Sequence, residues 1–239
     1  MQNTTYSFPR KMAAWGVHVF TSLGMVAGLL AIVAISRGQF REATLWLVVG
    51  QLIDGFDGTL ARWVQVGKVL PHISGKTIDM VIDFANYALI PAYFLYASGL
   101  IGAPWHGIAA GVILLASALY YGKDGMISED YYFIGFPVMW NLVVFYLYFV
   151  LHLPAAVNFG LVLFFALLHF VPLKFAYPSR ATRLRWLTFP LGALWIFLAA
   201  AILWIYPSTS SWLNGTALAI LGYFGFMAVR DTFIKPQRR

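Results

Sequence analysis

Apolar runs long enough to cross a lipid bilayer fill most of this chain. Of its 239 residues, 61% are hydrophobic and only 10% are charged, whereas a soluble globular domain carries about 25% charged residues. So few charges do not cover a water-facing surface of this size, which excludes a soluble fold and a disordered or nucleic-acid-binding chain. The absence of cysteine excludes disulfides, zinc–thiolate sites and a cysteine nucleophile. We therefore expect an all-α, polytopic integral membrane protein.

Eight segments are candidates for transmembrane helices, because a bilayer core about 30 Å thick requires about 20 apolar residues per helix. They span residues 14–35, 42–64, 75–98, 104–121, 135–151, 156–174, 187–206 and 213–229. Two of these segments are short, so seven or nine spans are also compatible with the pattern. No tandem repeat or soluble segment interrupts it. We expect one membrane domain over residues 1–239, beginning with an interfacial segment at residues 1–13.

The basic residues predict the orientation of these spans. If the N-terminus is cytoplasmic, only Arg37 and Arg41 of the 16 Lys and Arg residues lie in outer loops. Basic residues concentrate on the cytoplasmic side of membrane proteins. The pattern therefore predicts a multi-pass protein of the cytoplasmic (inner) membrane with both termini in the cytoplasm. The net charge of +7 then reports sidedness and does not indicate an anionic partner such as nucleic acid.

Four aspartates lie within or at the ends of the second and third predicted spans. They are Asp54, Asp57, Asp79 and Asp83. An aspartate at the centre of a spanning helix costs about 2.5–3.5 kcal/mol on insertion scales, so each one needs an explanation. Spacings of three and four residues place each pair on one side of its helix. A short loop between the two helices makes them an antiparallel hairpin in which the pairs can face one another.

Few cations are available to neutralise these carboxylates. Arg62, Lys68 and Lys76 are nearby in the sequence, but they lie toward the loop. Clustered carboxylates suit Mg²⁺ or Mn²⁺, which prefer oxygen ligands. Two such ions a few ångströms apart clamp phosphate oxygens during displacement reactions. The pattern predicts a site for two divalent metal ions, and the alternative is a set of salt bridges or the ion path of a cation transporter.

Small residues accompany the aspartates. Gly55, Gly58 and Gly75 flank them, although glycine in a helix costs about 1 kcal/mol relative to alanine. Three such glycines indicate that a bulky polar ligand lies against the backbone. Ala61 keeps the same face slim, and Arg62 can meet a phosphate group as a bidentate donor.

Together these positions resemble the signature of the CDP-alcohol phosphotransferases. The pattern is Asp54-x2-Asp57-Gly58-x2-Ala61-Arg62, followed by Gly75-x3-Asp79-x3-Asp83, over residues 54–83. Twelve residues separate Arg62 from Gly75, more than in the usual family pattern. This longer form, with the additional Gly55, is similar to the branch of bacterial phosphatidylcholine synthases. Residues 123–141 are similar to that branch as well.

The resemblance implies an enzyme that transfers the phosphatidyl group of CDP-diacylglycerol to choline and releases CMP. It implies that the four aspartates hold two Mn²⁺ or Mg²⁺ ions and that Asp83 is also the catalytic general base. The residues implied in CDP-diacylglycerol binding are Thr21, Gly58, Ala61, Arg62 and Gly75. By analogy with related enzymes, we also expect a homodimer in the lipid membrane.

The choline site is expected in an aromatic-rich stretch, because quaternary ammonium groups bind aromatic faces. The candidates are Glu129, Tyr131, Tyr132, Phe136 and Trp140. The alternative is an ordinary interfacial aromatic belt.

The acceptor alcohol could also be serine, inositol phosphate or glycerol phosphate. The enzyme would then be a phosphatidylserine, phosphatidylinositol-phosphate or phosphatidylglycerol-phosphate synthase, respectively. Of the remaining acids, Glu42 and Asp231 lie near helix ends, and we expect no specific role for them.

Overall fold

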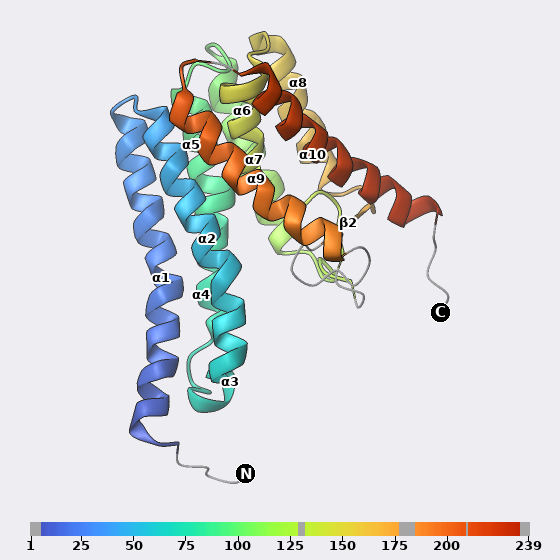
Figure 1. Ribbon diagram of the computed structural model, residues 1–239. Helices are drawn as coiled ribbons and strands as arrows, with labels where there is room; N and C mark the ends of the chain where they lie inside the picture. Colours follow the sequence, from blue (N-terminus) through green and yellow to red (C-terminus); the bar gives the residue numbers. More distant parts are fainter. Residues whose placement is uncertain (1–5, 129–131, 177–184, 209, 235–239) are drawn as a thin grey trace. The chain divides into compact units, whose positions relative to one another are not determined.

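The computed structural model describes residues 6–128, 132–176, 185–208 and 210–234. The chain divides into two compact units, an N-terminal unit (Met1–Ile90) and a C-terminal unit (Pro91–Arg239). Helices make up nearly all of the described structure, with one small sheet (Figure 1). This confirms the predicted helical membrane fold.

The N-terminal unit is built on a hairpin of two long helices (Figure 1). Its elements are α1 (Phe8–Ser36), α2 (Phe40–Val64), α3 (Val66–Val69), α4 (Gly75–Phe84) and the π-helical turn η1 (Ala85–Leu89). Helix α1 packs against α2 and α4 through a stripe of mostly small buried residues. The stripe contains Ala14, Val17, His18, Thr21, Gly24, Ala27, Gly28, Ala31, Ala34 and Ile35. Small residues let helix backbones approach closely, so α1 lies directly against the elements that carry the aspartates.

Two local signals reverse the chain between the aspartate pairs. Helix α2 ends at Gln65, whose φ of 59° is in the left-handed region that commonly terminates helices. Helix α4 begins after Ser74, whose hydroxyl accepts a hydrogen bond from the backbone N–H of Thr77 at 3.2 Å. Such an N-cap satisfies one of the free amides at a helix start. The reversal turns the second aspartate pair back toward the first.

The C-terminal unit contains the remaining helices and a two-stranded sheet. Its elements are α5 (Ile90–Ala97), α6 (Trp105–Tyr121), β1 (Tyr132–Ile134), α7 (Trp140–Phe145), the π-helical turn η2 (Tyr146–Leu151), α8 (Ala155–Leu168), β2 (Lys174–Ala176), α9 (Arg185–Ile205), α10 (Ser211–Val229) and the π-helical turn η3 (Arg230–Ile234). Strands β1 and β2 are antiparallel, and Phe133 lies opposite Phe175. Each strand is three residues long, and neither was predicted from the sequence.

Helices lie in all eight of the predicted spans. Among the described residues, four helices are long and apolar enough to cross a membrane: Phe8–Ser36, Gly75–Ala97, Trp186–Ile205 and Ser211–Phe233. The apolar helices Trp105–Tyr121, Trp140–Leu151 and Ala155–Leu168 are shorter, and the 25-residue α2 contains several charged residues. The structure therefore supports a multi-pass membrane protein, and the count of eight spans stays a prediction.

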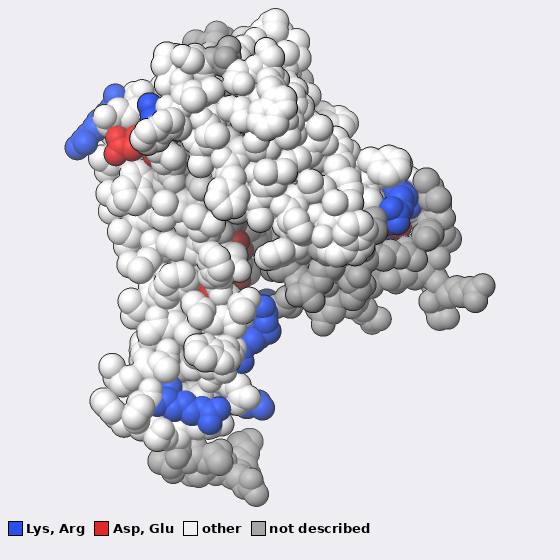
Figure 2. Space-filling model, in the orientation of Figure 1, with Lys and Arg blue, Asp and Glu red and all other residues white. Residues whose placement is uncertain are grey.

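The basic residues of the N-terminal unit gather toward its two ends. Arg37 and Arg41 lie at the turn between α1 and α2, and Arg10, Lys68 and Lys76 lie at the opposite end of the hairpin. Figure 2 shows a largely uncharged band between these ends. Such a band suits contact with lipid. Within the expected interfacial segment at residues 1–13, Phe8 and the residues after it form the first part of α1. Residues 1–5 of that segment lie outside the described residues.

Candidate functional site

Three of the four aspartates come together in the N-terminal unit. Asp54 and Asp57 on α2 and Asp79 on α4 each offer a carboxylate oxygen, and these oxygens lie within 4.8 Å of one another. The Asp57 side chain is buried, with 7% of its surface exposed. Like charges this close repel strongly when they are out of water. A divalent cation relieves that repulsion, so the donor set fits the predicted Mn²⁺ or Mg²⁺ site.

The fourth aspartate lies beside this group of three. Asp83 is one turn along α4 from Asp79, and its carboxylate is close enough to the other three for mutual repulsion. It is not one of the three residues whose oxygens form the compact group. The structure thus brings all four residues to one site and distinguishes Asp83 from the other three.

Two hydroxyl groups contact the aspartates. The Tyr87 hydroxyl donates a hydrogen bond of 2.7 Å to Oδ2 of Asp54. The Thr21 hydroxyl lies within hydrogen-bonding reach of Asp57 and 3.2 Å from the carbonyl oxygen of Val17. Thr21 was a predicted site residue and Tyr87 was not. Tyr87 continues the spacing of four residues from Asp79 and Asp83, and that spacing was a signal that could have identified it.

The predicted nucleotide-binding residues surround the aspartates in different ways. The Arg62 side chain is exposed and folds back along α2, where its Nη2 donates to the Thr59 hydroxyl at 3.0 Å. A Cβ added at Gly58 would lie 3.3 Å from Nη1 of Arg62, while one at Gly55 would meet nothing within 4 Å. The backbone of α2 is therefore open at Gly55, whereas the Arg62 side chain covers it at Gly58. Ala61, one turn further on, is half-buried.

The backbone at the start of α4 lies against α1. A Cβ added at Gly75 would lie 3.3 Å from Cε1 of His18, so a larger residue at this position would press on the imidazole ring. His18 is buried, and its Nε2 has no hydrogen-bond partner among the described residues. Glycine at position 75 thus allows the start of α4 to lie close to the His18 ring.

Two of the predicted choline-binding residues lie in the core of the C-terminal unit. Phe136 stacks on the His169 ring at 5.7 Å between ring centroids, and Trp140 meets that ring edge-on at 5.4 Å. Trp140 is fully buried and donates from Nε1 to the Ser117 hydroxyl at 2.9 Å. Rings at these distances pack against one another. Tyr131 and Glu129, also predicted for this site, lie outside the described residues.

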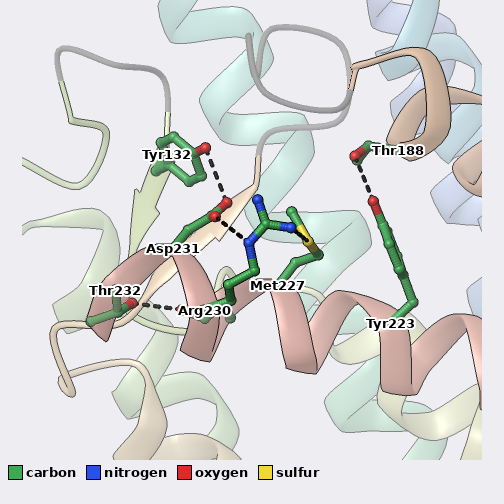
Figure 3. A network of polar contacts seen from close by, with 8 residues as sticks. Tyr132, Thr188, Tyr223, Met227, Arg230, Asp231 and Thr232 are labelled. Atoms are coloured by element: carbon green, nitrogen blue, oxygen red, sulfur yellow. Dashed lines mark hydrogen bonds and ion pairs between the residues drawn. The ribbon is translucent and has the colours of Figure 1, made fainter. Parts of the chain in front are cut away.

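Tyr132, a further predicted choline-binding residue, belongs to a buried polar network (Figure 3). Its hydroxyl donates to Oδ2 of Asp231 at 3.1 Å, and Nε of Arg230 lies 3.7 Å from Oδ1 of Asp231. Next to Asp231, the Thr232 hydroxyl accepts from the backbone N–H of Lys174 at 2.8 Å. This network joins the sheet to the end of α10. The expectation that Asp231 has no specific role is therefore wrong, because its side chain is 4% exposed and holds a tyrosine.

Several known proteins similar to this chain carry the same name. No family model matches it. The phosphatidylcholine synthase of Rhizobium johnstonii is 39% identical over 218 residues, which cover 89% of this chain and 90% of that protein. The enzyme of the same name from Agrobacterium fabrum is 41% identical over 84% of this chain and 83% of its own length. The chain belongs to the phosphatidylcholine synthase family.

The similarity to phosphatidylcholine synthases extends through both units. The phosphatidylcholine synthase of Borreliella burgdorferi is 31% identical over 226 residues, which cover 95% of this chain and 96% of that protein. This breadth confirms the resemblance drawn from the aspartate pattern. The alignment reaches well beyond the 30 residues of that pattern.

Proposed function

We propose that the chain transfers the phosphatidyl group of CDP-diacylglycerol to choline and releases CMP. The observation that carries this conclusion is the similarity to phosphatidylcholine synthases over most of both proteins. The group of three carboxylates in the N-terminal unit supports it, because phosphoryl-group chemistry commonly uses divalent metal ions held by carboxylates. Serine, inositol phosphate and glycerol phosphate are less well supported as acceptors, and so is cation transport.

The reaction requires a base, a leaving group and a way to neutralise charge. The choline hydroxyl oxygen forms a bond to the phosphorus that carries diacylglycerol, and the bond from this phosphorus to CMP breaks, with the electron pair leaving on CMP. Asp83 accepts the hydroxyl proton. Two Mn²⁺ or Mg²⁺ ions, held by Asp54, Asp57, Asp79 and Asp83, would neutralise the pyrophosphate oxygens when bound.

The remaining residues bind the substrates in this proposal. The open backbone at Gly55 admits the CDP group, glycine at position 75 lets that group approach α4 closely, and the Arg62 guanidinium pairs with phosphate. The CDP-binding residues are Thr21, Gly58, Ala61, Arg62 and Gly75. The residues that shape the choline site in this proposal are Glu129, Tyr131, Tyr132, Phe136 and Trp140, with Phe136 and Trp140 acting from within the core.

The choline assignment has a direct kinetic test. Glu129→Gln should raise the KM for choline more than the KM for CDP-diacylglycerol, because the lost carboxylate would pair with the ammonium group. Equal changes in the two KM values would contradict this assignment.

We further propose eight spans with both termini in the cytoplasm, in the cytoplasmic membrane. The charge separation along α1 and α2 supports this orientation. The proposal includes a single membrane domain and a homodimer.

The function is tested by measuring CMP release from purified protein given CDP-diacylglycerol and Mn²⁺. Choline, serine, inositol phosphate and glycerol phosphate are supplied one at a time, and a reaction without any alcohol is the control. We expect CMP release with choline alone. Release in the absence of an alcohol, or with another acceptor in place of choline, would contradict the proposal.

A further inference from the structure

The Tyr87 hydroxyl is a neutral donor that reaches the aspartate group. It lies 2.7 Å from Oδ2 of Asp54, and the Tyr87 side chain is 7% exposed. Hydrogen bonds to a carboxylate are shorter and about twice as strong as those between neutral groups. A bond of this kind fixes the direction in which the Asp54 carboxylate presents its other lone pairs.

Tyr87 lies in one of the three π-helical turns of the described residues. Helix α4 ends at Phe84, and residues Ala85–Leu89 form the π-helical turn η1. π-Helical turns are rare and occur frequently at functional sites, because the extra residue changes the direction of the side chains that follow. Here the turn lies immediately after Asp83 and contains Tyr87.

Asn86, next to Tyr87, anchors this turn. Its Nδ2 donates to the Gly24 carbonyl of α1 at 3.0 Å. A Cβ added at Gly28 would lie 2.7 Å from Oδ1 of Asn86, and one at Gly50 of α2 would lie 3.2 Å from Nδ2. The amide therefore occupies a space that only glycines leave open. Asn86 is hydrogen-bonded to α1 and packs closely against α2, which restrains the backbone next to Tyr87.

We infer that Tyr87 is a positioning residue that orients Asp54 as a ligand for the divalent metal ion. This inference rests on the metal site of the proposed function. Groups that hydrogen-bond to metal ligands typically change metal affinity by 10–100-fold when they are removed. The Tyr87 hydroxyl donates to Asp54, so we expect the effect of its removal on metal binding to pass through that carboxylate.

The test compares Mn²⁺ binding to the full-length wild-type protein and to Tyr87→Phe in detergent. Free Mn²⁺ is measured by electron paramagnetic resonance, without substrate and without turnover. We expect the dissociation constant of Tyr87→Phe to rise about 10–100-fold. The Mn²⁺ concentration that gives half-maximal CMP release should rise by a similar factor, while the KM for choline stays unchanged.

Tyr146→Phe is the matched control, because its buried hydroxyl donates to the Ala217 carbonyl at 2.7 Å instead of to an aspartate. This variant should bind Mn²⁺ like wild type. A second test adds Tyr87→Phe to Asp54→Asn. If Tyr87 acts through Asp54, the double variant should bind Mn²⁺ no more weakly than Asp54→Asn alone.

The outcomes separate this inference from the proposed function. A wild-type protein that binds no Mn²⁺ would overturn both the metal site and the role of Tyr87. Wild-type affinity in Tyr87→Phe would overturn only the role of Tyr87. Equal losses in Tyr87→Phe and Tyr146→Phe, or additive losses in the double variant, would also overturn that role by indicating general loosening of the fold.

Discussion

At the residue scale, the four aspartates are not equivalent. Asp54, Asp57 and Asp79 share a compact space between two helices, whereas Asp83 lies beside them within range of their charge. A carboxylate in that position can stay close to the metal ions and still accept a proton from a bound alcohol. Asp83 can therefore contribute to metal binding and also accept the proton, whereas the compact group of three is left to metal binding.

This division predicts different behaviour for two conservative substitutions. Asp83→Asn should lower kcat by about 10²–10⁴-fold, the usual contribution of a general base, with a modest change in Mn²⁺ affinity. Asp79→Asn should weaken Mn²⁺ binding much more strongly, because it removes a member of the compact group. Metal titration alongside CMP release distinguishes the two effects. Identical losses of affinity in both variants would contradict the division.

Asp231 is a buried acid whose partners are known. Its carboxylate accepts from the Tyr132 hydroxyl and lies beside Arg230. Asp231→Ala should lower the free energy of unfolding by about 1–3 kcal/mol, because the Tyr132 hydroxyl would be left buried without its acceptor. Unfolding of the purified protein in a denaturing detergent measures the change. Asp231→Asn retains an acceptor oxygen and should cost less, and a larger loss in Asp231→Asn than in Asp231→Ala would contradict this account.

At the scale of the elements, features that depend on nearby residues were predicted from the sequence, and features that depend on contacts between distant segments were not. The aspartates were found because helical spacing is local and a charge in an apolar helix is conspicuous, as at Asp54 and Asp79. The three-residue strands β1 and β2 were not predicted, because their pairing joins segments about 40 residues apart. The role of Asp231 was missed because it depends on another long-range contact, the hydrogen bond from Tyr132, which lies 99 residues away in the sequence.

The packing of α1 against η1 makes a specific prediction about glycine. In Gly28→Ala the new Cβ would lie 2.7 Å from Oδ1 of Asn86 and 2.8 Å from Cδ1 of Ile90. Overpacking of this kind costs about 1–3 kcal/mol. The matched control is Gly16→Ala on the same helix, where a Cβ meets nothing within 4 Å. The control should be neutral or slightly stabilising. Thermal unfolding measures both variants, and an equal fall in their melting temperatures would contradict the packing account.

At the scale of the whole molecule, the proposed topology fixes which loops reach the outside of the cell. The turn after α1 contains Gln39, and α3 contains Lys68; both side chains are exposed. In the proposed orientation the first position is external and the second is cytoplasmic. The sequence predicts where the apolar segments lie. The number of them that cross the bilayer also depends on how each helix tilts and packs against neighbouring helices.

The absence of native cysteine makes this orientation directly measurable. Gln39→Cys should react with a membrane-impermeant maleimide in intact cells, whereas Lys68→Cys should react only after the membrane is opened. Each variant carries a single thiol, so each serves as the control for the other. Labelling of Lys68→Cys in intact cells would contradict a cytoplasmic α3.

The contact between Asn86 and the glycines of α1 and α2 also restricts how this sequence can evolve. Gly28 and Gly50 have space for a methyl group only if the amide at position 86 becomes smaller or moves. Substitutions at these positions should therefore show epistasis: each is harmful alone, and some are tolerated in pairs. A library that varies the three positions together should recover alanine at Gly28 chiefly when position 86 carries a smaller side chain.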